Sequence, residues 1–141
     1  MANILLIDDD AQVRQVLLLL LTEAGHAVTV AGDGKEGMAL FRAEPADLVI
    51  TDIVMPNEEG LETIVKLRRE FPALGIIAMS GNTLHSPTWL KVAALLGANQ
   101  TLAKPFSLSR FTEAVAQVLA TNPRNRKTVL QPVSGLSPID S

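Results

Sequence analysis

Residues 4–10 read Ile-Leu-Leu-Ile-Asp-Asp-Asp, and this stretch decides the fold. Four consecutive apolar residues are typical of a strand that is buried on both faces, and three acids then end it. A helical pattern follows directly over residues 11–24. Its apolar face is predicted to consist of Val13, Val16, Leu17, Leu20 and Leu21. A buried strand followed at once by a helix is the repeating unit of a parallel α/β sheet.

The same alternation continues to about residue 120. Strands are predicted at 26–31, 46–51, 75–80 and 99–103, and helices at 34–43, 61–70, 87–96 and 108–120. Gly25 is expected to end the first helix, whereas Asp33 and Ser107 are expected to cap later ones. Five strands alternating with five helices predict an α/β fold, in which helices cover both faces of a parallel sheet.

Composition fits one globular domain and excludes several classes of protein. The 141 residues are 48% apolar and carry a formal net charge of −3. This negative charge argues against binding to nucleic acid or to an anionic membrane through the whole surface of the protein. Cysteine is absent, so disulfides, thiolate metal sites and a cysteine nucleophile are excluded. The longest apolar run, residues 16–21, is too short to span a bilayer. The start of the chain lacks a signal-peptide pattern, and we expect a cytoplasmic protein.

The end of the chain has a different character. Residues 122–141 hold three prolines and show no apolar periodicity, so we expect a flexible tail or linker after a folded domain at 1–121. Three basic residues and one acid give this segment a net charge of +2, which leaves −5 for the rest of the chain. The acidic excess therefore belongs to the folded domain.

Polar residues follow four of the predicted strands. Asp8, Asp9, Asp52, Ser80 and Lys104 stand where strands end, and ligands of open α/β sheets bind beyond the carboxyl ends of the strands. Clustered carboxylates repel one another unless a cation lies among them, and hard divalent cations take oxygen ligands. Carboxylates, a hydroxyl and a lysine at one edge are the groups that metal-assisted phosphoryl transfer requires.

These motifs resemble the receiver domain of bacterial two-component response regulators. The resemblance rests on residues 4–10, on Asp52 to Pro56 with Gly60, on Ser80-Gly81, and on Lys104-Pro105-Phe106. Asp9 and Asp52 are 43 residues apart, Asp52 and Ser80 are 28 apart, and Ser80 and Lys104 are 24 apart. The resemblance covers about residues 2–120 and implies a doubly wound, flavodoxin-like sheet of five strands in the order 2-1-3-4-5.

The resemblance assigns a role to each matching residue. It implies that Asp52 accepts a phosphoryl group from a histidine kinase or a histidine phosphotransfer protein. Asp9 and Asp52 would bind Mg²⁺ or Mn²⁺ directly, Asp8 through water, and Val54 through its backbone carbonyl. Such a receiver catalyses only its own phosphorylation and dephosphorylation, so it is not an enzyme in the usual sense.

The remaining roles concern the phosphoryl group and the output of the domain. The resemblance implies that Ser80 bonds the attached phosphoryl oxygen, that Lys104 pairs with it, and that the Lys104–Pro105 peptide is cis. Asp10 is expected to begin the first helix. Thr101 stands where family members commonly carry Tyr or Phe, so the aromatic half of the usual switch is expected to be missing.

The resemblance implies that the first helix, beside the acidic pocket, docks the histidine-bearing partner, and we therefore hypothesise an apolar docking patch on this helix and on the segment after Lys104. Residues 16–21 are apolar on every side, although one buried face needs only about half of these positions, so Leu18 or Leu19 is expected to be exposed. If Leu18→Glu and Leu19→Glu both leave phosphotransfer intact, this idea fails. The expected docking residues are Val13, Val16, Leu18, Leu19, Pro105 and Phe106.

Several alternatives remain open. The chain is interpreted as a single-domain regulator, but it also fits the amino-terminal receiver of a longer regulator. We expect a monomer or weak dimer that signals to an unknown protein and contacts no DNA. A receiver used only as a binding module would be expected to lack a site residue. A haloacid-dehalogenase-like phosphatase would use Asp8 as nucleophile, but after Lys104 it needs a further acidic site, and only Glu113 and Asp140 remain.

Overall fold

The structure is a computed structural model that describes residues 1–53, 59–81 and 86–121. Every element begins and ends within two residues of its predicted position. The strands are β1 (Asn3–Ile7), β2 (Ala27–Ala31), β3 (Leu48–Asp52), β4 (Gly75–Ser80) and β5 (Gln100–Ala103). The helices are α1 (Ala11–Glu23), α2 (Gly34–Ala43), α3 (Glu59–Glu70), α4 (Ser86–Leu96) and α5 (Leu108–Thr121).

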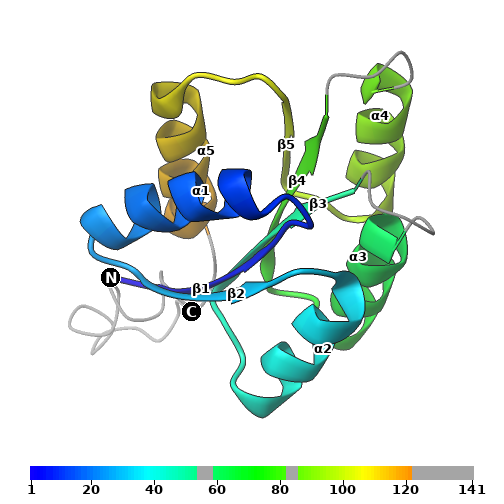
Figure 1. The fold of residues 1–141 in the computed structure, drawn as a ribbon. Coiled ribbons are helices and arrows are strands. Elements are labelled where there is room, and N and C mark those ends of the chain that lie inside the picture. The colour runs from blue at the N-terminus through cyan, green and yellow to red at the C-terminus, as the bar shows by residue number, and fades with distance from the viewer. Residues whose placement is uncertain (54–58, 82–85, 122–141) are drawn as a thin grey trace, which may run out of the picture.

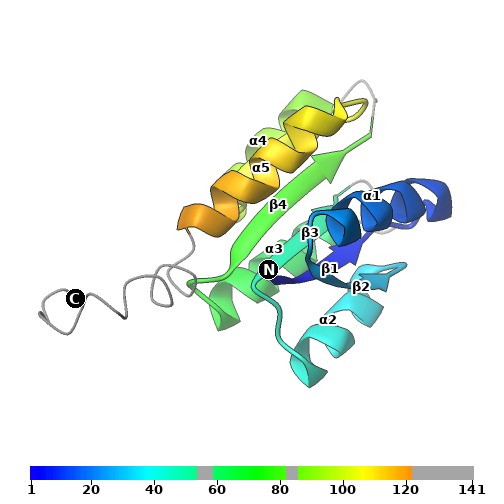
Figure 2. The ribbon, with the colours of Figure 1, turned by 90° about the vertical axis from the view of Figure 1, so that its left-hand side faces the viewer.

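The five strands form one parallel sheet in the order β2-β1-β3-β4-β5, which confirms the predicted fold class and strand order. Helices α1 and α5 cover one face, and α2, α3 and α4 cover the other (Figure 1). The arrowheads of β1 and β4 point to the same side of the molecule (Figure 2). Since all strands run the same way, the residues that follow them meet at one edge of the sheet.

Two apolar clusters hold the layers together, one on each face of the sheet. Alternate residues of β1 serve the two faces: Ile4 and Leu6 pack with α1 and α5, whereas Leu5 and Ile7 pack with the helices of the other face. All four are at most 2% exposed. A strand buried on both faces needs a continuous apolar run, which is why residues 4–7 show no alternation with polar residues.

Side-chain caps fix where three helices begin. The carboxylate of Asp10 accepts hydrogen bonds from the backbone N–H groups of residues 12 and 13, as expected for the residue that starts α1. Asp33 and Ser107 accept comparable bonds from the first turns of α2 and α5. Gly25 follows α1 with a φ of +95°, a conformation that glycine adopts without steric cost.

Helix α1 buries a narrower face than the sequence predicts. Leu17 and Leu21 are buried, but Val16 is 52% exposed and Leu19 is 61% exposed, whereas Leu18 is only half-buried. A helix turns about 100° per residue, so Val16 and Leu18 lie to either side of Leu17, and Leu19 lies on the outer face. The expectation of an exposed apolar residue is confirmed at Leu19, and the placement of Val16 on the buried face is wrong.

Candidate functional site

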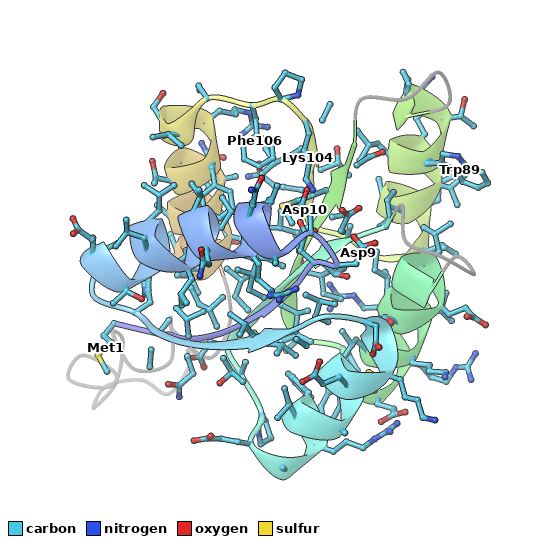
Figure 3. All side chains as sticks on the ribbon, viewed as in Figure 1. Met1, Asp9, Asp10, Trp89, Lys104 and Phe106 are labelled. Carbon is cyan, nitrogen blue, oxygen red and sulfur yellow. The ribbon has the colours of Figure 1, made fainter. Side chains whose placement is uncertain are left out.

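The site lies at the carboxyl edge of the sheet. Asp8 follows β1, Asp52 ends β3, Ser80 ends β4, and Lys104 follows β5. Neighbouring strands place these residues together although they are far apart in sequence, since β1 pairs with β3, and β4 lies between β3 and β5. In Figure 3, Lys104 lies above Asp9 and Asp10, whereas Trp89 projects from α4 away from them.

Three carboxylates meet at this edge. Asp8 is fully buried, Asp52 is 5% exposed, and Asp9 is open to solvent. Each offers a carboxylate oxygen within 4.8 Å of those of the other two. Three negative charges at this separation are unfavourable, and a hard cation with oxygen ligands relieves their repulsion. This donor set fits Mg²⁺.

Lys104 reaches into the carboxylate cluster. Its Nζ lies 2.9 Å from Asp8 Oδ2 and 3.0 Å from Asp52 Oδ2. Burial disfavours its charged form, but the hydrogen bonds and negative charges of Asp8 and Asp52 outweigh burial, so the pKa of Lys104 is raised above its ordinary value. Lys104 is therefore a permanent positive charge beside the carboxylate of Asp52.

Asp8 is held at four of its atoms. Its N–H donates to the Ala31 carbonyl at 3.1 Å, and its Oδ1 accepts the Asp10 N–H at 2.9 Å. Its Oδ2 accepts from Lys104. Its carbonyl oxygen accepts from Arg14 Nη1 at 2.6 Å, a contact that the sequence analysis missed. The one sequence signal for this contact was the position of Arg14, a basic residue in the first turn of a helix that follows three acids.

The backbone of Asp52 is fixed by close packing. A Cβ on Gly60 would overlap the carbonyl oxygen of Asp52 and the Cα of Ile53. The first turn of α3 therefore approaches the end of β3 at a distance that only glycine permits. The N–H of Ile53 donates to the Met79 carbonyl at 2.8 Å, which continues the pairing of β3 with β4 beyond Asp52.

The hydroxyl of Ser80 lies inside the same edge. Ser80 is fully buried, and its Oγ makes a long contact of 3.4 Å with the Gly81 carbonyl. The N–H of Lys104 donates to the Ser80 carbonyl at 2.8 Å, so the pairing of β5 with β4 extends one residue beyond β5 to Lys104. The Lys104–Pro105 peptide is cis, as the resemblance implies. Thr101 is half-buried on β5, in register with Ala78 of β4.

An apolar groove of about 420 Å³ adjoins the site, and we call it the α1–α5 groove. Among the described residues, Gln12, Gly81 and Lys104 line it. Its apolar lining residues are Val13, Val16, Leu17, Pro105, Phe106 and Leu108.

Four of the expected docking residues therefore line one groove: Val13, Val16, Pro105 and Phe106. Leu18 and Leu19 do not line it. Leu108 was missed, although an apolar residue in the first turn of a helix directly after Pro-Phe was a signal for it.

Other residues considered from the sequence lie away from the site or outside the described residues. His26 Nδ1 accepts the Ala2 N–H at 3.1 Å, at the opposite edge of the sheet. Trp89 is half-buried against the core on the side of α2, α3 and α4. The expected metal ligand Val54 lies outside the described residues, as do His85 and Asn82. None of the described helices combines the length and apolar character that a bilayer crossing requires.

Comparisons with known proteins agree with this geometry. The sequence model of the response regulator receiver domain matches residues 4–116. The transcriptional regulator NtrC of Azospirillum brasilense is 38% identical over 122 residues, which are 86% of this chain and 25% of that protein. The response regulator ArlR of Staphylococcus epidermidis is 33% identical over 124 residues, which are 87% of this chain and 55% of that protein. This chain thus spans only part of the length of these relatives.

Solved structures show the same fold. A receiver domain from Clostridium thermocellum is 28% identical, with a TM-score of 0.78 over 92% of this chain and 99% of that one. The response regulator TrrA of Thermotoga maritima, in complex with Mg²⁺–BeF, is 30% identical, with a TM-score of 0.74 over 84% of this chain and 99% of that one. The strand order, the acidic edge and the sequence match together place this chain in the response regulator receiver domain family.

Proposed function

We propose that this chain accepts a phosphoryl group on Asp52 from a histidine kinase or a histidine phosphotransfer protein. The observation that supports this most is the contact between the Asp52 carboxylate and Lys104 within a cluster of three carboxylates. A carboxylate oxygen of Asp52 attacks phosphorus, the bond between phosphorus and the donor nitrogen breaks, and the electron pair leaves with the donor imidazole. Lys104 then neutralises charge on the transferred oxygens.

The proposal assigns Mg²⁺ or Mn²⁺ to the carboxylate cluster. Asp9 and Asp52 would hold the ion directly, because Asp9 is open to solvent and Asp52 lies beside it. Asp8 would act through water, since both of its carboxylate oxygens already accept hydrogen bonds from the protein. The carbonyl of Val54 would complete the protein ligands. When bound, the ion supplies positive charge for the phosphoryl oxygens.

Ser80 is proposed to bond a phosphoryl oxygen after transfer. The long 3.4 Å contact of its Oγ is easily exchanged for a shorter one to a charged oxygen. Thr101 limits the conformational response to this bond, because it has no ring to turn inward when Ser80 engages. We expect the face formed by α4, β5 and α5 to respond less to phosphorylation than in receivers with an aromatic residue at this position.

The docking surface for the phosphodonor partner is proposed to be α1 and the α1–α5 groove. Val16 is 52% exposed and Leu19 is 61% exposed, and an exposed apolar patch beside a reactive site favours a protein contact. Leu19→Glu is expected to slow transfer from the partner kinase, whereas Leu95→Glu on α4 leaves it unchanged. Equal transfer rates for the two variants would exclude this surface. Residues 1–121 are proposed to form the domain that accepts the phosphoryl group and docks the partner. The protein is proposed to act in the cytoplasm.

A phosphatase with Asp8 as nucleophile is disfavoured by the contacts of Asp8. This side chain is fully buried and both carboxylate oxygens are engaged, so its oxygens have no open approach. Asp52 is the carboxylate that combines slight exposure with contact to Lys104. Incubation with acetyl phosphate in Mg²⁺ buffer is therefore expected to label the protein, and Asp52→Asn to abolish labelling. Stoichiometric labelling of Asp52→Asn would overturn the proposal.

A further inference from the structure

Strand β2 is an open edge of the sheet. Within the described residues it stands first in the strand order, and β1 is the strand that pairs with it. The N–H of Ala27 and the carbonyl of Ala31 bond to the residues that flank β1. Because alternate residues of a strand bond on opposite sides, Val28 and Val30 direct their N–H and carbonyl groups outward. Natural sheet edges are guarded by charges or prolines, and β2 contains neither, so this edge can accept another strand.

A hollow of about 90 Å³ lies along this edge, and we call it the β2 hollow. Its walls come from the amino halves of β1 and β2, from the end of α2 and from the segment after α2. Within its described lining, Glu44 is the one charged residue. An added strand gains affinity from backbone hydrogen bonds and specificity from a side chain that enters such a hollow. The edge therefore suits an extended segment with an apolar side chain and a nearby positive charge.

The chain beyond α5 offers positive charges at the same end of the molecule. Glu23 ends α1 and Glu44 follows α2, and both are exposed near the amino ends of the strands. Helix α5 ends at this edge as well, near the start of β4 (Figure 2). Within the next six residues come Arg124, Arg126 and Lys127. This basic run therefore leaves α5 at the edge where Glu23 and Glu44 lie, and opposite charges attract.

The width of the sheet matches the length of the basic run. Helix α5 packs on β4 and β5. Four strand spacings of about 4.8 Å, roughly 19 Å in all, separate β4 from a strand added beside β2. The seven steps from Thr121 to Thr128 span up to roughly 24 Å when the chain is extended. Thr128 is thus about the first residue that reaches the edge, and it begins the run Thr-Val-Leu, which favours a strand.

The handedness of the crossover also selects the β2 edge. Helices α1 and α5 cover the same face of the sheet (Figure 1). The unit β1–α1–β2 steps over this face toward the β2 edge, and a parallel strand after α5 that lies beside β2 steps in the same direction. The two crossovers therefore have the same hand. A parallel strand on the far side of β5 would have the opposite hand, and crossovers are right-handed in about 98% of cases.

We propose that residues 128–131 pair with β2 as a sixth, parallel strand. Val129 and Leu130 then point to opposite faces, so one fills the β2 hollow and the other packs beside the β2 valines on the α1 face. Pro132 follows the strand and cannot donate to a further one. The chain beyond it emerges at the carboxyl edge of the sheet, on the side of the acidic site. This inference is independent of phosphorylation at Asp52.

The experiment measures amide hydrogen exchange of the full chain by NMR. The N–H groups of Val28 and Val30 are expected to exchange about tenfold more slowly in wild type than in the double variant Val129→Asp/Leu130→Asp, a factor typical of one or two net hydrogen bonds. Whichever way the strand faces, this variant places one acid in the hollow beside Glu44. The N–H of Ala27, which bonds toward β1, is the internal control and is expected to keep its exchange rate.

The matched control is Val133→Asp/Leu136→Asp, which adds the same two charges beyond Pro132 and is expected to behave as wild type. Rapid exchange of Val28 and Val30 in wild type would overturn the proposal. Slow exchange that survives in the first double variant would do the same, as would equal loss of protection in both double variants. Protection that increases with protein concentration would indicate pairing with a second copy of the chain and would also overturn it.

Discussion

Replacing Lys104 with methionine tests the electrostatics of the site most sharply. The change keeps much of the aliphatic length but removes the ammonium group that contacts Asp8 and Asp52. The side chains of Asp8 and Asp52 are 0% and 6% exposed, so both charges lose their partner in a poorly solvated place. Removing one member of a buried ion pair costs about 3–5 kcal/mol. Because Lys104 itself is 18% exposed, water recovers part of this, and we expect a loss of about 2–4 kcal/mol.

The assay is urea unfolding at neutral pH in buffer free of divalent cations. Lys91→Met, on the exposed side of α4, is the matched control and is expected to stay within about 0.5 kcal/mol of wild type. Combining Lys104→Met with Asp52→Asn removes one of the two stranded carboxylates, so the double variant is expected to be more stable than Lys104→Met alone. A loss below about 0.5 kcal/mol for Lys104→Met would refute the reasoning, as would strict additivity in the double variant.

Three further outcomes are expected. Asp9→Asn should raise the free energy of unfolding in the absence of metal, because it removes one of three clustered charges. The variant should also lose most of the stabilisation that Mg²⁺ gives the wild-type protein. Thermal melts with and without Mg²⁺ check both results. Arg68→Met should lower the free energy of unfolding, measured in urea, by several kcal/mol. Arg68 donates to four backbone carbonyls and a side-chain amide oxygen around the carboxyl ends of α3 and α4. The control Arg69→Met replaces an exposed side chain and should change the free energy of unfolding little. Burial and the nearby terminal amino group lower the pKa of His26 below 6.5. As the pH falls, the unfolded chain therefore takes up this proton before the folded chain does, and the free energy of unfolding should decrease below pH 6.5. This decrease should be smaller in His26→Asn.

The fold was predictable because its signals are local. Residues 4–7 are continuously apolar, and a strand in the middle of a parallel sheet requires this. The capping acids Asp10 and Asp33 have short side chains that bond their own helix, so their role follows from sequence position alone. The meeting of Asp8, Asp52, Ser80 and Lys104 followed from one rule, that parallel strands end at the same edge of a sheet.

Long side chains and surface packing were harder to predict. Arg14 contacts the Asp8 carbonyl through a flexible side chain, and sequence spacing does not fix where such a side chain ends. Val16 was assigned to the buried face because it fits the helical period, yet the line of contact on α1 is narrow and leaves it 52% exposed. Leu108 joins the groove only because α5 begins close to α1, which is a tertiary relation.

The most direct test of the central claim is to map the phosphorylated residue. The protein is incubated with acetyl phosphate and Mg²⁺, digested under conditions that preserve acyl phosphates, and analysed by tandem mass spectrometry. We predict one acyl phosphate, on Asp52, which forms only when Mg²⁺ is present and is absent from Asp52→Asn. A phosphoryl group on Asp8, or an Asp52 that stays unmodified while another residue is labelled stoichiometrically, would contradict the assignment of Asp52 as the acceptor.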